Sequence, residues 1–294
     1  MQDANSKFYV EKTECSEKVD FDRECVTVID GAVYTKTQDG ILRMDCFYDE
    51  QITKKKPAII WIHGGGFTEE HMTRKSRPEK RFLQLVKKGY FIASIDYRLA
   101  QVRPFPAQME ECKCAVRYLR KHADRFGIDP DKIGVWGESC GGQVAGLMSV
   151  TDGIPDFEDK GGYEGISSSI QAAVSWYGAL DVMEFHKIRM AVDEVYPERF
   201  AVIYGGTPEE KTDMLIKANP LTYIEQPHCP VLAMCSDADD RVSYTANTEF
   251  CERAKEYGNI AEFRIVPGQG HGYFQGEEYD RILYDFFDQY LMNE

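Results

Sequence analysis

A serine flanked by glycines follows a short apolar run near the middle of the chain. Residues 133–136 lead directly into the sequence Gly137-Glu138-Ser139-Cys140-Gly141-Gly142. A G-x-S-x-G pattern that closes a buried strand is typical of a nucleophile elbow, a tight strand-to-helix turn that exposes the serine hydroxyl. Because the same five residues also occur in ordinary turns, the other groups of a nucleophilic site must be found elsewhere in the chain.

A serine hydroxyl becomes a good nucleophile only when a neighbouring base accepts its proton, and imidazole suits that role near neutral pH. Of the six histidines, His271 lies in a glycine-flanked loop between the last predicted strand and the final helix, so we predict that it is the base. We expect His63 to brace the glycine run that follows it. The remaining four are expected in loops or on the surface: His71, His122, His186 and His228.

An acid must hold the imidazole in one tautomer and stabilise its protonated form. Asp237, Asp239 and Asp240 follow one predicted strand, and we choose Asp239, with Asp237 as the alternative. A calcium loop is excluded because Arg241 and Val242 stand where further oxygen ligands and a glycine would be needed. An ordinary solvated loop stays open as an interpretation of this acidic run.

The run His63-Gly64-Gly65-Gly66 follows another apolar strand and matches the HGGG pattern of oxyanion holes. Backbone N–H groups in such a run, with the N–H of Cys140 after the serine, can bind a developing negative charge. The run lacks the Lys-Ser/Thr of a phosphate-binding loop and the spacing of a dinucleotide fingerprint. No metal-binding spacing is present either, so we predict neither a cofactor nor a metal.

Alternating strand and helix patterns must position these groups. Short, mostly continuous apolar runs predict strands at residues 58–62, 90–95, 133–136, 172–176, 231–235 and 261–266, and helical patterns predict helices at 77–88, 107–122 and 282–291. Such an alternation is typical of a mainly parallel sheet covered by helices on both faces. The partly alternating runs 25–29, 32–36 and 41–48 are predicted as antiparallel strands at one edge. Ligands of such sheets bind at the carboxyl ends of the strands, where the serine, acid, base and glycine run all fall.

Two segments interrupt this alternation. Residues 151–169 are predicted to form a long loop, and part of residues 180–229 is predicted to form a small cap beside the site. We expect residues 1–294 to form one α/β domain with this cap as an insertion.

The composition restricts the partners and the compartment. The 294 residues carry a formal net charge of −14, which disfavours nucleic acid and anionic membranes as partners. Residues 1–20 lack the apolar core of a secretory signal, and no apolar run reaches the roughly 18 residues of a membrane helix. With nine cysteines in such a chain, we predict free thiols and a cytoplasmic location. A homo-oligomer stays open.

Together, His63-Gly64-Gly65-Gly66-Phe67, the sequence at 137–142 and the chain order Ser139, Asp239, His271 resemble the α/β-hydrolase superfamily, in its hormone-sensitive-lipase-like esterase group. The resemblance covers roughly residues 40–290. It implies that Ser139 is the nucleophile, His271 the general base and acid, and Asp239 the orienting acid. It also implies an oxyanion hole made by Gly65, Gly66 and Cys140. The position of Cys140 often holds alanine in such proteins.

The predicted activity is therefore hydrolysis of a short-chain, acetyl-type carboxylic ester through an acyl-enzyme. The resemblance also implies removal of acetyl or feruloyl groups from oligosaccharides as a further expectation. Aromatic residues near the strand ends are candidate substrate contacts: Phe67, Tyr97, Tyr177 and Tyr273. A formamidase or other amidase with the same triad and a non-catalytic ligand-binding homologue are the alternatives.

Overall fold

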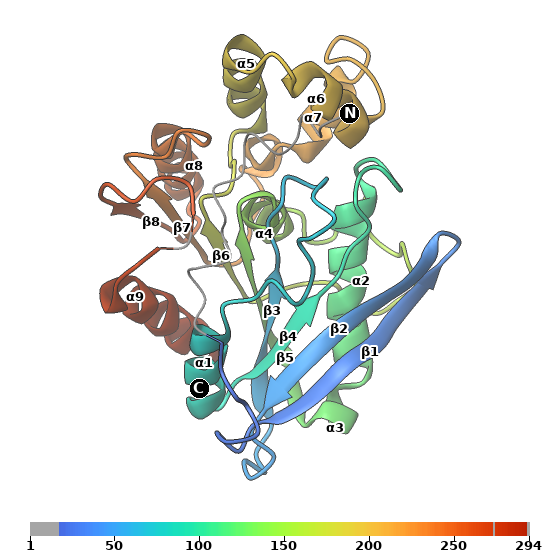
Figure 1. The fold of residues 1–294 in the computed structure, drawn as a ribbon, viewed down its shortest axis with the longest axis vertical. Coiled ribbons are helices and arrows are strands. Elements are labelled where there is room, and N and C mark those ends of the chain that lie inside the picture. Colours follow the sequence, from blue (N-terminus) through green and yellow to red (C-terminus); the bar gives the residue numbers. More distant parts are fainter. Residues whose placement is uncertain (1–17, 273, 293–294) are drawn as a thin grey trace.

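The fold is built on one sheet of eight strands in the order β1-β2-β4-β3-β5-β6-β7-β8. A computed structural model describes residues 18–272 and 274–292 (Figure 1). The strands are β1 (Thr27–Thr37), β2 (Gly40–Tyr48), β3 (Lys56–Ile62), β4 (Phe91–Ile95), β5 (Ile128–Glu138), β6 (Ala172–Trp176), β7 (Val231–Ser236) and β8 (Ala261–Val266).

The sheet is parallel from β4 through β8, while β1 and β2 pair antiparallel at one edge. This arrangement confirms the predicted mainly parallel sheet with an antiparallel edge. The predicted strands at 25–29 and 32–36 are one strand, β1, whose register shifts between Ile29 and Ala32. At this shift Asp30 and Gly31 stand opposite the single residue Asp45, and Gly31, which has φ +71°, donates its N–H to the buried Asp45 side chain. A β-bulge of this kind absorbs extra residues without ending the strand.

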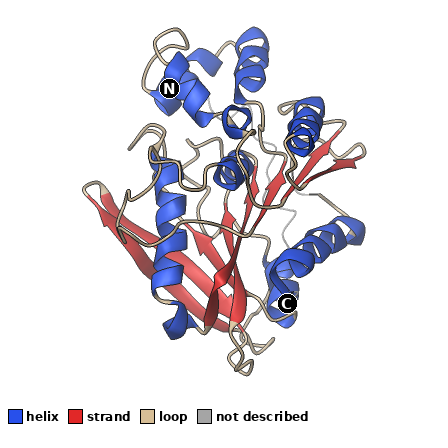
Figure 2. Cartoon of the chain, turned by 180° about the vertical axis from the view of Figure 1, so that it is seen from behind, coloured by secondary structure: helices blue, strands red, loops and turns tan. Residues whose placement is uncertain are grey.

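Helices cover both faces of the sheet, as Figure 2 shows. The helices α1 (Glu79–Lys87) and α9 (Glu277–Phe287) pack their apolar side chains on one face, and a π-helical turn (Asp288–Met292) follows α9. The other face carries α2 (Ala107–Lys121), α3 (Ala123–Phe126), α4 (Cys140–Val150) and α8 (Tyr244–Glu256). Residues 151–169 contain turns and bends but neither helix nor strand, as predicted for a long loop.

A helical insertion separates β6 from β7. It consists of α5 (Val182–Val192), α6 (Tyr196–Tyr204), α7 (Thr212–Ala218) and the 3-10 helix η3 (Pro220–Tyr223). Figure 1 shows α5, α6 and α7 grouped beyond α4, at one end of the molecule. The insertion touches the loop after β4, where Phe105 donates its N–H to Ile203 O at 2.8 Å. The helical insertion therefore lies next to the loop after β4 and on the same side of the molecule as α4.

His186 lies in the core of this insertion and not on its surface, so that expectation was wrong. Its Nε2 is 2.9 Å from the hydroxyl of Tyr204, and its Nδ1 is hydrogen-bonded to the hydroxyl of Tyr196. The ring also packs edge-on against Phe200. Burial lowers the pKa of His186 to about 3, so the imidazole is neutral in the folded protein at neutral pH.

This buried imidazole makes stability depend on pH. In the unfolded chain a histidine takes up a proton near pH 6.5, whereas His186 in the folded chain does so only near pH 3. The contribution of the neutral His186 to the free energy of unfolding is therefore complete above pH 6.5 and is lost as the pH falls toward 3. We expect the stability advantage of the wild type over His186→Gln to shrink by about 2–3 kcal/mol between pH 7 and pH 4.5.

Urea unfolding of both proteins at the two pH values measures this difference. Glutamine keeps a hydrogen-bond donor and acceptor but does not titrate, so it is the matched reference. An advantage that is the same at both pH values would contradict the neutral, buried imidazole.

No helix in the described ranges, 18–272 and 274–292, is long and apolar enough to cross a membrane. The eight cysteines in these ranges are free thiols. His, Cys, Asp and Glu side chains form no group there that could hold a metal ion.

Candidate active site

Ser139 stands at a sharp turn between β5 and α4. Its backbone has φ 54° and ψ −121°, an arrangement that residues with a Cβ rarely adopt, and its N–H donates to Trp176 O of β6 at 2.9 Å. Gly137 and Gly141, which flank this turn, must be glycines because neighbouring backbone atoms leave no room for a Cβ. A Cβ on Gly137 would lie 1.9 Å from Gly141 O, and one on Gly141 would lie 2.2 Å from Ile62 O. The sequence therefore forms the strained elbow that its pattern predicts.

Strain of this kind costs of the order of 1–3 kcal/mol per residue. Glycine adopts positive φ freely, whereas alanine keeps the Cβ that causes the strain. We therefore expect Ser139→Gly to unfold at a higher temperature than Ser139→Ala, with a free energy of unfolding about 1 kcal/mol larger. Both variants lack the hydroxyl, so the comparison isolates the backbone. Equal stability of the two would contradict a strained elbow.

The side chains of Ser139, His271 and Asp239 form one connected chain of hydrogen bonds. Ser139 Oγ is 2.9 Å from His271 Nε2, and His271 Nδ1 is 2.8 Å and 3.0 Å from the two carboxylate oxygens of Asp239. The side chains of His271 and Asp239 are 4% and 0% exposed. In this arrangement Nδ1–H donates to the carboxylate, which leaves Nε2 to accept the serine proton.

Asp239 is held as an ionised carboxylate. Burial raises the pKa of Asp239, but the hydrogen bond and electrostatic attraction of His271, together with N–H groups donated by Val242 and Arg241, outweigh burial and leave the pKa below its usual value. The alternative acid, Asp237, instead accepts the N–H of Gly268 at 2.6 Å at an exposed position. The carboxylate that contacts the imidazole is therefore that of Asp239.

Tyr177 packs against the imidazole of His271. Its ring contacts His271 edge-on, with centroids 4.9 Å apart, and its hydroxyl donates to Glu138 at 2.9 Å. The side chain is completely buried. Because no part of this side chain is exposed, the structure does not support its expected role as a substrate contact. Phe274 also packs edge-on against Tyr177, with ring centroids 5.2 Å apart.

The glycine run after β3 has an unusual backbone. Gly65, Gly66 and Phe67 have φ values of 105°, 53° and 64°, three successive residues in the left-handed region. Among the described residues, none accepts a hydrogen bond from the N–H of Gly65, Gly66 or Cys140. These three donors are therefore available for an oxyanion.

A residue of the helical insertion packs on this run. A Cβ on Gly66 would lie 1.8 Å from Nη2 of Arg199, a residue of α6, so the guanidinium lies directly against the glycine. Nη2 is also 3.4 Å from Glu69 Oε1 and 3.5 Å from Gly66 O. The sequence pattern gave no sign of this contact, because 133 residues separate Arg199 from Gly66.

The side chains of His63 and Tyr97 pack together and hydrogen-bond to backbone carbonyls at the start of the glycine run. The two rings stack with centroids 4.2 Å apart, His63 Nδ1–H donates to Gly64 O at 2.7 Å, and burial lowers the pKa of His63 to about 4. The Tyr97 hydroxyl donates to His63 O at 2.9 Å. His63 thus braces the run as expected, and Tyr97, which is 4% exposed, does the same. Phe67 is 5% exposed, and both Phe67 and Tyr97 stay candidate substrate contacts, while Tyr273 lies outside the described residues.

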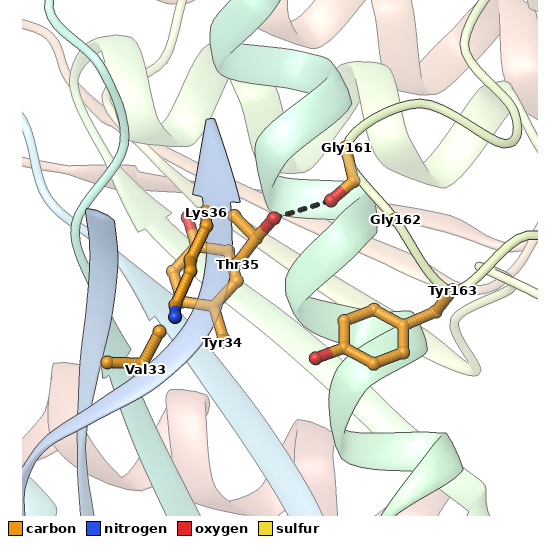
Figure 3. Close-up of a pocket in the computed structure, with 7 residues that line it drawn as sticks. All are labelled: Val33, Tyr34, Thr35, Lys36, Gly161, Gly162 and Tyr163. Carbon is orange, nitrogen blue, oxygen red and sulfur yellow. Dashed lines mark hydrogen bonds between the residues drawn. The ribbon is translucent and has the colours of Figure 1, made fainter. Parts of the chain in front are cut away.

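A groove of about 470 Å³ lies elsewhere, between β1 and the loop at 161–163. Figure 3 shows Tyr163 across from β1, and the Thr35 hydroxyl bonded to Gly161 O at 2.5 Å. Three strands, β2, β4 and β3, separate β1 from β5, which carries the elbow. At about 4.8 Å between neighbouring strands, the groove is about 19 Å from the elbow strand. It is therefore not the place of the serine chemistry.

Comparisons with known proteins agree with this geometry. The sequence profile of the BD-FAE family matches residues 44–253. Esterase LipC of Mycobacterium tuberculosis is 27% identical over 222 residues, which are 75% of this chain and 54% of that protein. The chain spans about half the length of this and two further mycobacterial relatives.

Solved structures share the architecture. A bifunctional GH43-CE protein of Bacteroides eggerthii has a TM-score of 0.80 at 27% identity, over 90% of this chain and 38% of that one. A truncated carbohydrate esterase from gut microbiota has a TM-score of 0.74 at 24% identity, over 91% and 97% of the two chains. At that identity the second likeness shows the fold alone.

Proposed function

Because the chain belongs to the BD-FAE family, an α/β-hydrolase family, we propose that it hydrolyses carboxylic esters of short acyl groups through an acyl-enzyme on Ser139. The observation that carries this proposal is the hydrogen-bonded chain from Ser139 through His271 to Asp239. Membership in this family also confirms the resemblance to α/β-hydrolase esterases.

Acylation begins with attack of Ser139 Oγ on the ester carbonyl carbon, while the serine proton moves to His271 Nε2. The carbonyl oxygen becomes an oxyanion and accepts the N–H groups of Gly65, Gly66 and Cys140. When the tetrahedral intermediate collapses, His271 gives the proton to the departing alcohol oxygen. The acyl group then stays on Ser139, and the ionised Asp239 has stabilised the imidazolium throughout.

Deacylation repeats these steps with water in place of the serine hydroxyl. His271 Nε2 accepts a proton from water, which attacks the acyl carbon, and the same three N–H groups hold the second oxyanion. Return of the proton to Ser139 Oγ releases the carboxylic acid and restores the free enzyme. Every step uses residues of this chain and water.

Nitrophenyl esters from acetyl to octanoyl test the proposed reaction. We expect turnover to be highest for acetyl or propionyl and to decline with longer chains, measured as kcat/KM from nitrophenol release. The matched nitroanilide of acetic acid separates the amidase alternative. An amide turned over faster than the ester would replace esterase by amidase, and tight binding of esters without turnover would support a non-catalytic homologue.

The proposed natural substrates are acetylated or feruloylated oligosaccharides. This choice rests on the family resemblance and accords with the name of the gut carbohydrate esterase of similar fold. We further propose that the helical insertion acts as a cap over the site, since Arg199 of α6 reaches Gly66. Release of acetate or ferulate from a panel of such oligosaccharides, compared with the free methyl esters, tests the preference. Equal rates on sugar-linked and methyl esters would contradict it.

A further inference from the structure

The thiol of Cys140 links the nucleophile turn to the glycine run. Phe67 donates its backbone N–H to Cys140 Sγ at 3.3 Å, and the Tyr97 hydroxyl lies 3.5 Å from the same sulfur. Cys140 directly follows Ser139, while Phe67 directly follows Gly66. One side chain thus joins the two segments that must face each other across a reacting carbonyl.

The hydrogen bond from Phe67 N–H to Cys140 Sγ fixes the peptide next to the one that carries the Gly66 N–H. The N–H that Sγ accepts belongs to the Gly66–Phe67 peptide, and the preceding peptide carries the N–H of Gly66. Because Gly65 and Gly66 are both at positive φ and lack side chains, rotation of one peptide there readily turns the next. On its other side the run is held by Ala100, whose N–H donates to Phe67 O at 2.8 Å. The two bonds together clamp Phe67 at both ends of its backbone.

The thiol is suited to accept this bond. Burial raises the pKa of the Cys140 thiol, which the contacts with the Tyr97 hydroxyl and the Phe67 N–H only partly offset, so the group is a neutral thiol. Since the Tyr97 hydroxyl donates to His63 O, the thiol proton can point to the tyrosine oxygen. The sulfur lone pairs then face Phe67 N–H. An alanine at this position offers no acceptor.

We propose that the Cys140 side chain is a positioning residue for ester hydrolysis: its sulfur accepts Phe67 N–H and holds the N–H groups of Gly65 and Gly66 in line with Ser139. The inference rests on the proposed esterase function and extends it. Cys140 then serves the oxyanion twice, directly through its own N–H and indirectly through its sulfur. Substitution by alanine keeps the direct role, because the backbone N–H remains, and removes the indirect role.

The test compares Cys140→Ala with Cys140→Ser on nitrophenyl acetate. Alanine removes the acceptor, and we expect kcat to fall by about 10- to 100-fold while KM changes less than twofold, as for an interaction made in the transition state. Serine supplies a hydroxyl acceptor, and we expect it to restore kcat to within about threefold of the wild type. Circular dichroism melting of each variant checks that it is folded.

Two further variants separate the explanations. Cys251→Ala removes another buried thiol, on α8, whose sulfur donates to Glu262 O. We expect its kcat to be unchanged, so a fall equal to that of Cys140→Ala would overturn the positioning role. Wild-type kcat in Cys140→Ala, or a serine variant as slow as the alanine variant, would also overturn it. Ser139→Ala tests the reaction itself, since full turnover in that variant would defeat the esterase mechanism, whatever the Cys140 variants do.

Discussion

Replacement of Ser139 by alanine is expected to lower kcat/KM for nitrophenyl acetate by about 10⁴-fold or more. The hydroxyl oxygen is the atom that attacks, and it is the atom that lies 2.9 Å from His271 Nε2. The variant keeps the three backbone donors of the oxyanion hole, so a small residual rate above that in water is expected. Spectrophotometric release of nitrophenol measures the effect.

Ser243 provides a matched control. Its hydroxyl caps α8 by accepting the N–H of Ala246, and it belongs to no part of the proposed mechanism. We expect Ser243→Ala to change kcat/KM by less than twofold, although the lost cap lowers stability by about 1 kcal/mol. Activity of Ser139→Ala within tenfold of the wild type would contradict Ser139 as the nucleophile.

Replacement of Asp239 by asparagine is expected to lower kcat by about 10³- to 10⁴-fold. The amide can donate its NH₂ to His271 Nδ1, which favours the tautomer with the proton on Nε2. A protonated Nε2 cannot accept the serine proton. The loss of negative charge also removes the stabilisation of the imidazolium. Initial rates at saturating nitrophenyl acetate measure kcat for this variant.

The neighbouring Asp237 is the natural comparison, since the sequence alone left it as an alternative. Its carboxylate is exposed, and within residues 18–272 and 274–292 it accepts only the N–H of Gly268, so Asp237→Asn should keep kcat within about threefold. If Asp237→Asn were as slow as Asp239→Asn, the assignment of the acid would be wrong.

The sheet and the three connected side chains could be predicted from the sequence because their signals are local. Most strands of the parallel part contain a short run of mainly apolar residues, and the reactive residues follow strand ends that meet at one edge of the sheet. The sequence places both Asp237 and Asp239 after β7 but does not show which side chain faces the histidine. In the structure the turn after β7 directs Asp239 toward His271. Local sequence patterns are therefore enough to predict the sheet and the three side chains that it brings together.

The features that could not be predicted depend on contacts between distant segments. The union of two predicted strands into β1 depends on the bulge at Gly31 and its bond to Asp45. His186 is buried because Tyr196 and Tyr204 of α6 enclose it, and a single polar residue on α5 carries no sign of that. Likewise, the bond from Phe67 to Cys140 joins residues 73 apart in the chain.

Covalent labelling of Ser139 tests the central claim most directly. Paraoxon phosphorylates serines that are activated by a neighbouring base, and the aged product stays attached for mass spectrometry of the intact chain and of its peptides. We predict one phosphoryl group per chain, on the peptide that contains Ser139, and no labelling of Ser139→Ala. Labelling at another residue, or undiminished labelling of Ser139→Ala, would contradict the acyl-enzyme mechanism.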